Sequence, residues 1–218
     1  NQITTFHEFV FHEEESVNLL ANGQQWLGED FSFEDIQSFN FRLTDLKLDE
    51  PVVIRARGVA VSSSNTQMRF NVNGQDLMDL NFSLIPNNSL TKASSDENSI
   101  SALLNNELIA IQITYNNSGN PSSRAYLDFI EVIGTRRLIA RGPQFSFLNT
   151  NASDPLSIYE YTVQNVTNIG ELWNVSDPVN PKKIINEGNA DDFVFKAFGG
   201  DKSFVVLGTE PFFIPETL

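Results

Sequence analysis

The stretch GELWNVSDPVNPKKI, Gly170–Ile184, decides most about the fold of this chain. It places an apolar run that contains a tryptophan before a turn, and a second apolar run begins after the turn. Pro178 and Pro181 each fix φ and lack an N–H, and the Asp177 side chain can close an Asx-type turn. The chain therefore has to reverse before Lys182, which predicts a strand, a tight reversal and a second strand.

The rest of the sequence continues this pattern. Apolar residues recur mostly at every second position, and turn residues interrupt them at intervals typical of antiparallel sheets, so we expect an all-β fold. Asn73-Gly74 tolerates positive φ and predicts a hairpin, and the one candidate helix is the short segment Ser99–Asn105. The strands expected in the first part are Phe39–Leu43, Val52–Val61, Gln67–Val72, Leu77–Leu84, Leu108–Tyr115 and Tyr126–Ile133.

The texture of the sequence changes after Gly134, where Arg136-Arg137 and the Arg-Gly-Pro of 141–143 interrupt the apolar runs. We place a module boundary there. Residues 1–24 are expected to form a lead-in strand, residues 25–134 a jelly-roll-like antiparallel β-sandwich and residues 135–218 a smaller β module. The short strands expected in that module are Phe145–Leu148, Ile158–Val163, Glu171–Val175, Lys183–Ile185, Asp192–Phe198 and Phe204–Leu207, with Gly199-Gly200 turning the last two into a hairpin.

Phenylalanine dominates the aromatic residues, with 18 Phe against 4 Tyr and 2 Trp. Many come as i, i+2 pairs, so both rings of a pair point to one side of a strand. We interpret them as core residues of a sandwich, with a ligand-stacking platform as the alternative. The pairs are Phe9 and Phe11, Phe31 and Phe33, Phe39 and Phe41, Phe145 and Phe147, and Phe193 and Phe195.

Composition excludes several functions. The chain has no Cys and only two His, so thiol catalysis, disulfides and thiolate metal sites are absent. The formal net charge is −14, and such a surface repels phosphate backbones and anionic headgroups, which argues against nucleic-acid partners and direct membrane insertion. The acidity itself serves either solubility or acid-mediated recognition. No window is apolar and long enough for a membrane helix.

The two histidines, His7 and His12, lie in the string FHEFVFHEEE. In an extended strand a separation of five puts them on opposite faces, so we do not expect them to share a zinc ion. Glu13–Glu15 are interpreted as a solvated strand end or turn. We therefore nominate no catalytic, cofactor-binding or metal-binding residue and expect no cofactor.

A structural Ca²⁺ assembled from separate acidic loops stays open. The acidic pairs that could contribute oxygens are Glu29-Asp30, Asp49-Glu50, Asp96-Glu97 and Asp191-Asp192.

Some single side chains have two readings. Asp128 lies inside an apolar strand, so it either pairs with Arg55 or Arg57 or is an exposed rim acid. Trp26 and Trp173 sit beside turns, where an indole either seals a sandwich edge or stacks on a sugar or a protein partner. The cation pairs Arg136-Arg137 and Lys182-Lys183 are too small for a nucleic-acid footprint and are candidates for contacting a following domain.

Three strings carry a resemblance to a known family: NGQQWLGEDFSF at Asn22–Phe33, AYLDFIEV at Ala125–Val132, and the Gly170–Ile184 stretch. Their order and spacing resemble the region ahead of the protease domain in the PorU-like sortases of the type IX secretion system, which are gingipain-like cysteine endopeptidases. The resemblance runs from about Asn22 to the end of the chain. It implies a non-catalytic fragment of a surface enzyme.

The same resemblance implies the partners and the place of the parent protein. The catalytic Cys and His would lie in an α/β protease domain downstream, and the parent would remove C-terminal sorting domains from secreted cargo and attach the cargo to the cell surface. It would be associated with the outer membrane of a Gram-negative bacterium, together with an outer-membrane partner protein. Two other hypotheses remain: a carbohydrate-binding β-sandwich module, and a structural segment of a surface adhesin.

Overall fold

The computed structural model describes residues 1–19, 25–150, 152–188 and 191–209. Contacts divide the chain into two compact units: a large unit, Phe9–Gly134, and a small unit that joins Asn1–Glu8 to Thr135–Leu218. Both consist of strands, and no α-helix occurs in the described part of the chain, which confirms the all-β fold class. Accordingly, no helix in these ranges has the length and apolarity needed to cross a membrane.

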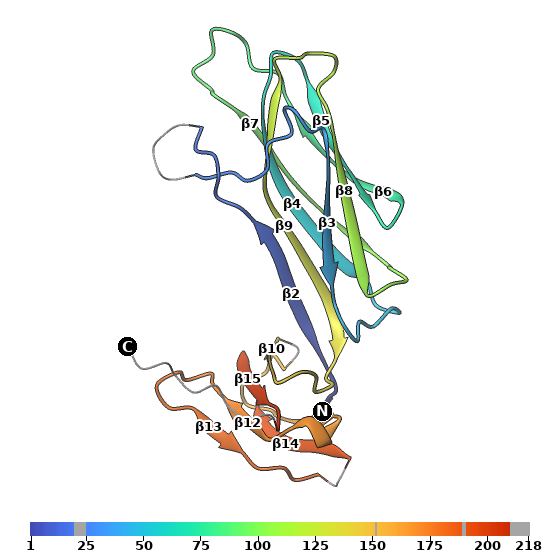
Figure 1. Ribbon diagram of the computed structural model, residues 1–218. Coiled ribbons are helices and arrows are strands. Elements are labelled where there is room, and N and C mark those ends of the chain that lie inside the picture. Colours follow the sequence, from blue (N-terminus) through green and yellow to red (C-terminus); the bar gives the residue numbers. More distant parts are fainter. Residues whose placement is uncertain (20–24, 151, 189–190, 210–218) are drawn as a thin grey trace, which may run out of the picture. The chain divides into compact units, whose positions relative to one another are not determined.

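Two four-stranded sheets form the large unit (Figure 1). The first has the order β2 (Thr5–Glu13), β9 (Arg124–Arg137), β4 (Val52–Val61) and β7 (Ser94–Ala102). The second has the order β3 (Ile36–Arg42), β8 (Leu108–Asn116), β5 (Thr66–Val72) and β6 (Gln75–Phe82), with every neighbouring pair antiparallel. The strands expected in this part of the sequence are all present. Residues 20–24, which include the end of the expected lead-in and the start of the NGQQWLGEDFSF string, lie outside the described residues.

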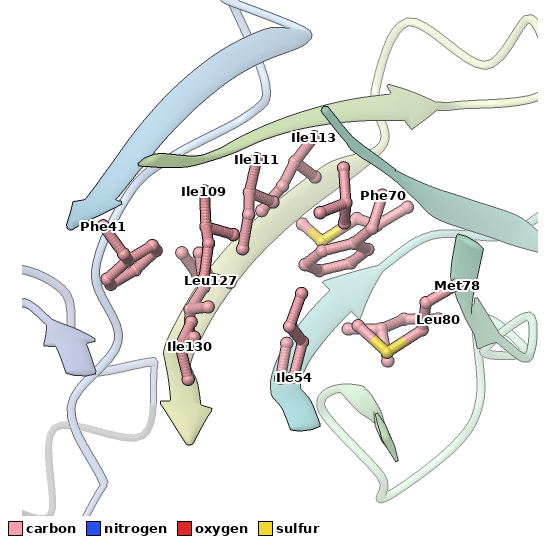
Figure 2. Close-up of a cluster of buried hydrophobic side chains, with 14 of the residues drawn as sticks. Phe41, Ile54, Phe70, Met78, Leu80, Ile109, Ile111, Ile113, Leu127 and Ile130 are labelled. Atoms are coloured by element: carbon pink, nitrogen blue, oxygen red, sulfur yellow. The ribbon is translucent and has the colours of Figure 1, made fainter. Parts of the chain in front are cut away.

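One core cluster takes side chains from both sheets, which makes the large unit a sandwich of the expected jelly-roll-like kind. Figure 2 shows Ile109, Ile111 and Ile113 projecting from β8 toward side chains of other strands, among them Ile54 and Phe70. All five side chains are almost completely buried. Because side chains alternate across a strand, the period-two pattern of the sequence is the cause of this layer.

The turn at Asn73-Gly74 joins β5 to β6 as predicted. Val72 pairs with Gln75, and Asn73 and Gly74 have φ of 48° and 86°. Positive φ at both central residues is the type I′ geometry that matches the twist of the flanking strands. The hairpin prediction is therefore confirmed.

A β-bulge interrupts β9 at Asp128. On β4, Arg57 is opposite Phe129 while the next residue, Gly58, is opposite Leu127, so Asp128 is the extra residue. The bulge shifts the alternation by one position: Leu127 is directed into the core before it and Ile130 after it.

The small unit has one three-stranded and one four-stranded sheet. The first contains β1 (Gln2–Ile3), β11 (Ile158–Gln164) and β14 (Asp192–Phe198), and β1 pairs with β11 in parallel. The second has the order β10 (Gln144–Asn149), β15 (Lys202–Leu207), β12 (Glu171–Asn174) and β13 (Lys182–Ile184), all antiparallel. A 3₁₀ turn, Val166–Asn168, precedes β12.

The Gly170–Ile184 stretch forms the predicted strand, reversal and strand. Asn174 pairs with Lys182, and the Asp177 carboxylate accepts a hydrogen bond from the Val179 N–H at 3.1 Å. This is the Asx turn expected from the sequence. The reversal prediction is confirmed.

Two local predictions are wrong. Ser99–Asn105 is not helical: residues up to Ala102 belong to β7, which pairs with β4 along its whole length. Ile100, Ala102 and Leu104 of this segment pack on the large core, whereas Leu103 is exposed. The buried residues are thus spaced by two, which is the period of a strand.

The second wrong prediction is the hairpin at Gly199-Gly200. β14 pairs with β11 and β15 pairs with β10 and β12, so the two strands lie in different sheets. Gly199 serves close approach instead, because a Cβ there would lie 2.1 Å from the Asp154 carbonyl oxygen, while Gly200 has a positive φ of 86°.

The interpretation of the Phe pairs as core holds for most of them but fails at two. Phe9 and Phe11 are 49% and 60% exposed on β2 and stack on each other at 5.8 Å. Phe31 is buried, yet Phe33 is 98% exposed, because these two residues lie in a turn where the alternation of a strand does not apply.

Candidate functional site

The strongest cluster of chemically capable side chains in the large unit begins at His12, near the end of β2. His12 lies two residues after Val10, which packs on the core, so the imidazole is directed to the same side. Its ring lies 4.8 Å from the ring of Phe39 on β3. Nε2 of His12 contacts Oε1 of Glu29. The imidazole is therefore held between an aromatic face and a carboxylate.

The backbone on both sides of Glu29 is fixed by hydrogen bonds. The Gly28 N–H donates to the Leu127 carbonyl at 2.8 Å, and the Leu127 N–H donates to the Glu29 carbonyl at 3.1 Å. Leu27 in turn pairs with Val17 as an antiparallel bridge. These contacts tie the segment that carries Glu29 to β9 and to the chain that follows β2.

Glu14 completes the cluster. It follows the last residue of β2, and a Cβ added to Gly28 would lie 3.2 Å from the Glu14 Cβ, so these two segments pack closely. One ligand atom from each of His12, Glu14 and Glu29 lies within 4.8 Å of the others. Oε2 of Glu29 is buried without a hydrogen-bond partner.

The cluster borders a surface hollow of about 740 Å³. The hollow brings solvent to His12 and Glu29, while the side chain of Glu29 itself is only 15% exposed. Besides these two residues it is lined by Phe11, Glu34, Ile36, Gln37, Ser38, Phe39, Asn40 and Phe41. The imidazole of His12 and the carboxylate of Glu29 border this hollow, and a second carboxylate, Glu14, has a ligand atom within 4.8 Å of theirs. This set has the chemistry of a cation site with room for further ligands.

The sequence predicts only part of this cluster. As expected, His7 and His12 do not share a site: His7 bonds Thr150 in the small unit at 3.1 Å, whereas His12 contacts Glu29. Glu13–Glu15 are exposed, as expected of a strand end. Glu29 was considered only as a contributor to an acidic loop. One sequence signal could have identified the cluster. His12 and Glu14 are two residues apart, so their side chains lie on the same face of an extended chain.

One member of each of three acidic pairs has a partner outside this cluster. Glu50 forms an ion pair with Lys47, Asp96 accepts a hydrogen bond from the Asn81 N–H at 2.7 Å, and Asp30 accepts one from the Ser32 N–H at 2.7 Å. Among the described residues, the His12, Glu14 and Glu29 group is the one set of three or more His, Asp or Glu side chains whose ligand atoms converge.

The structure decides between the two interpretations of Asp128 in favour of an ion pair. It is buried and bonds Nη1 of Arg57 at 2.6 Å, while Arg55 bridges Glu97 and Glu131 on the neighbouring strands. Burial raises the pKa of Asp128, and the Arg57 guanidinium lowers it in part. Asp128 therefore belongs to a structural ion pair at the bulge.

Among the remaining candidate side chains, one is partly exposed and three are paired with a nearby carboxylate. Trp26 is 42% exposed, while Nε1 of Trp173 donates to Glu171 at 2.8 Å. Lys183 bonds the same carboxylate at 2.5 Å, and Arg136 pairs with Glu8. Each of the last three side chains thus contacts its own unit.

Comparison with known proteins gives a fold and no family. No family model matches the sequence, and no curated protein matches it either. Among solved structures, dimeric latent PorU from Porphyromonas gingivalis superposes with a TM-score of 0.78 and 18% identity, covering 94% of this chain and 20% of the PorU chain. This chain thus spans about one fifth of PorU and has a PorU-like fold.

Two carbohydrate-binding modules also superpose, at lower scores. The CBM36-1 domain of a multidomain xylanase from the hindgut metagenome of Trinervitermes trinervoides gives a TM-score of 0.39 with 10% identity, covering 58% of this chain and 95% of the module. The CBM35 from Cellvibrio japonicus Abf62 gives 0.37 with 11% identity, covering 60% and 97%.

Proposed function

We propose that this chain is the non-catalytic N-terminal region of a PorU-like, cell-surface cysteine endopeptidase of the type IX secretion system. The observation that carries the proposal is the match to PorU over 94% of the chain at a TM-score of 0.78. The match extends over both units, and the strings that resemble the family also come from both. A single jelly-roll module would account for the large unit alone.

In this proposal the catalytic groups lie outside the chain. There is no Cys in its 218 residues, and its two imidazoles have separate partners, Thr150 and Glu29. A serine nucleophile would need an adjacent base oriented by a third group. The chain would then act as a scaffold that presents the downstream protease domain to secreted cargo and to an outer-membrane partner at the cell surface.

The test is to compare the isolated chain with the protein that its gene continues to encode. We expect the isolated chain to cleave no peptide that ends in a type IX sorting domain. The longer protein should contain an α/β domain with a paired His and Cys and should cleave such peptides. Replacing that Cys by Ala should abolish cleavage while both β units stay folded.

Other outcomes separate the alternatives. A glycoside hydrolase domain downstream would support a carbohydrate-binding module, and tandem β modules would support an adhesin segment. Thiol-independent cleavage by the isolated chain would contradict the proposal, because nothing in its residue inventory supplies a thiolate.

A further inference from the structure

We infer that His12, Glu14 and Glu29 form a binding site for a divalent transition-metal ion of the zinc class. The three side chains come from three places: the end of β2, the residue after it, and the segment that bonds to Leu127 of β9. The inference rests on the geometry of the large unit and does not depend on the proposed function.

The charges of the cluster favour a cation. Two carboxylates lie within 4.8 Å of each other with one imidazole beside them, and like charges at that distance repel, most strongly where burial excludes water. Oε2 of Glu29 is buried and has no hydrogen-bond partner, which costs free energy unless something else satisfies it. A divalent ion would neutralise both carboxylates and give that oxygen a partner.

The donor set selects the kind of ion. Imidazole nitrogen with carboxylate oxygen suits zinc and its neighbours in the transition series, whereas Ca²⁺ takes six to eight oxygens. In a tetrahedral zinc site the ligand atoms lie about 3.3 Å apart, given bond lengths of about 2.0–2.2 Å. The three donor atoms are close enough to reach that spacing by small side-chain rotations. The adjoining hollow supplies room for a water as the fourth ligand.

The surroundings of the donors are already ordered. The His12 ring lies against Phe39, and the backbone on both sides of Glu29 is bonded to β9. Glu14 is the exposed and most adjustable ligand. A bound ion would tie the end of β2 to the Leu27–Asp30 segment. Zinc at about one-hundred-fold excess over its Kd should therefore raise the Tm of the large unit by roughly 10 °C.

The first experiment measures zinc binding by isothermal titration calorimetry on the metal-free 218-residue chain. We expect one site. His12→Ala should weaken zinc binding by more than about 100-fold, because even residues that only support a ligand change metal affinity by about 10–100-fold. The matched control is His7→Ala, which removes the other histidine of the same strand and should leave the affinity unchanged.

A second pair of variants tests the site even if His12→Ala does not fold. Glu14→Gln changes an exposed residue outside the strand and should weaken zinc binding by at least about 10-fold. Glu15→Gln removes the neighbouring exposed carboxylate and should have no effect. Circular dichroism of each variant checks that the sheets are retained. Cobalt(II) added in place of zinc should give visible d–d absorption with the wild type and lose it with His12→Ala.

Three results would overturn the inference: no zinc binding by the wild type, equal loss in His7→Ala and His12→Ala, or binding of Ca²⁺ in preference to zinc. None of these measurements involves peptide cleavage. Failure of the metal site would leave the sortase proposal standing, and the reverse also holds.

Discussion

The large and small units both have a hydrophobic core of strand side chains, but the two cores contain different kinds of side chain. The large core consists mainly of Ile, Leu, Val and Met in alternating rows. The small core is centred on rings: Phe204 lies 5.0–5.2 Å from the rings of Phe147, Tyr161 and Phe195, and Tyr161 stacks on Phe195 at 4.8 Å.

Strand length explains the difference. Strands that lie wholly in the large unit run from 7 to 10 residues, for example β3 and β4, so many aliphatic side chains share the layer. Those wholly in the small unit have 2 to 7 residues, as in β1 and β11. With fewer inward positions, each side chain has to bury more surface, and aromatic rings bury about 150–250 Å² each. The small unit should therefore be more sensitive to the loss of one side chain.

The largest expected effect tests this sensitivity with one substitution made in both units. Phe204→Ala should lower the free energy of unfolding of the small unit by about 5 kcal/mol, because it removes a buried side chain and three ring contacts together. Phe70→Ala in the large unit should cost about 3 kcal/mol, since Phe70 is fully buried but has no ring pair within the described residues.

Each unit contains one tryptophan, which allows the two transitions to be followed separately. Denaturant unfolding in a Trp26→Phe background reports the small unit through Trp173, and Trp173→Phe reports the large unit through Trp26. Equal losses for Phe204→Ala and Phe70→Ala would remove the proposed contrast between an aromatic and an aliphatic core.

The next effect concerns how closely backbone approaches backbone. Gly199→Ala should destabilise the small unit by about 3 kcal/mol, because the added Cβ would meet the Asp154 carbonyl at 2.1 Å and the main chain has to move. Gly58→Ala is the matched change on β4, where the nearest atoms are side-chain atoms 3.2 Å away on Met68 and Phe82. Those can adjust, so we expect about 1 kcal/mol. Thermal unfolding measures both, and a larger loss at Gly58 would contradict the argument.

How far the sequence predicts each unit follows from the same physics. Period-two apolarity identified most β-strands of both units but not β7, and local turn chemistry identified the reversals at Asn73-Gly74 and at Asp177. Strand pairing was less accessible. Two adjacent glycines are compatible with a hairpin turn and also with a connection between two sheets. The pairing of β14 with β11 shows that Gly199-Gly200 is such a connection.

The candidate site was harder to predict than the fold. His12 and Glu14 are close in sequence, but Glu29 reaches them through the bridge between Val17 and Leu27, which has no strong apolar pattern. The partner of Asp128 was likewise open between two arginines, because a bulge of one residue in β9 decides which one it meets. Because Phe129 beside the bulge is apolar as well, the change of spacing between Leu127 and Ile130 cannot be recognised as a bulge from the sequence.

A smaller effect is expected in the pH dependence of stability, which should differ in sign between a carboxylate of the large unit, Asp128, and one of the small unit, Glu171. The pKa of Asp128 is raised by burial above its ordinary value of 3.8, with Arg57 opposing. A raised pKa means that the folded state favours the protonated form, so the contribution of Asp128 to stability is complete below pH 3.8 and is lost as the pH rises through the folded pKa.

Asp128→Asn removes this dependence. The variant should gain stability relative to the wild type as the pH rises through that window, and at pH 7 the two should differ by about 1 kcal/mol or less. Urea unfolding in a Trp173→Phe background, between pH 3 and 7, measures the difference. A difference that runs the other way would show that the ion pair with Arg57 outweighs burial.

The smallest effect should appear at Glu171 in the small unit, with the opposite sign. Its pKa lies below the ordinary value of 4.5 because it accepts hydrogen bonds from Lys183 and from the Trp173 indole. A lowered pKa contributes stability that is present above pH 4.5 and is lost as the pH falls through the folded pKa. Glu171→Gln should therefore be less stable than the wild type at neutral pH and equal to it in acid. Because the pair is solvated, added salt should reduce the difference.

Trp173 fluorescence in a Trp26→Phe background follows both unfolding and the surroundings of the indole. If Glu171→Gln were less stable than the wild type by the same amount at every pH, the charge of Glu171 would have no part in the stability difference.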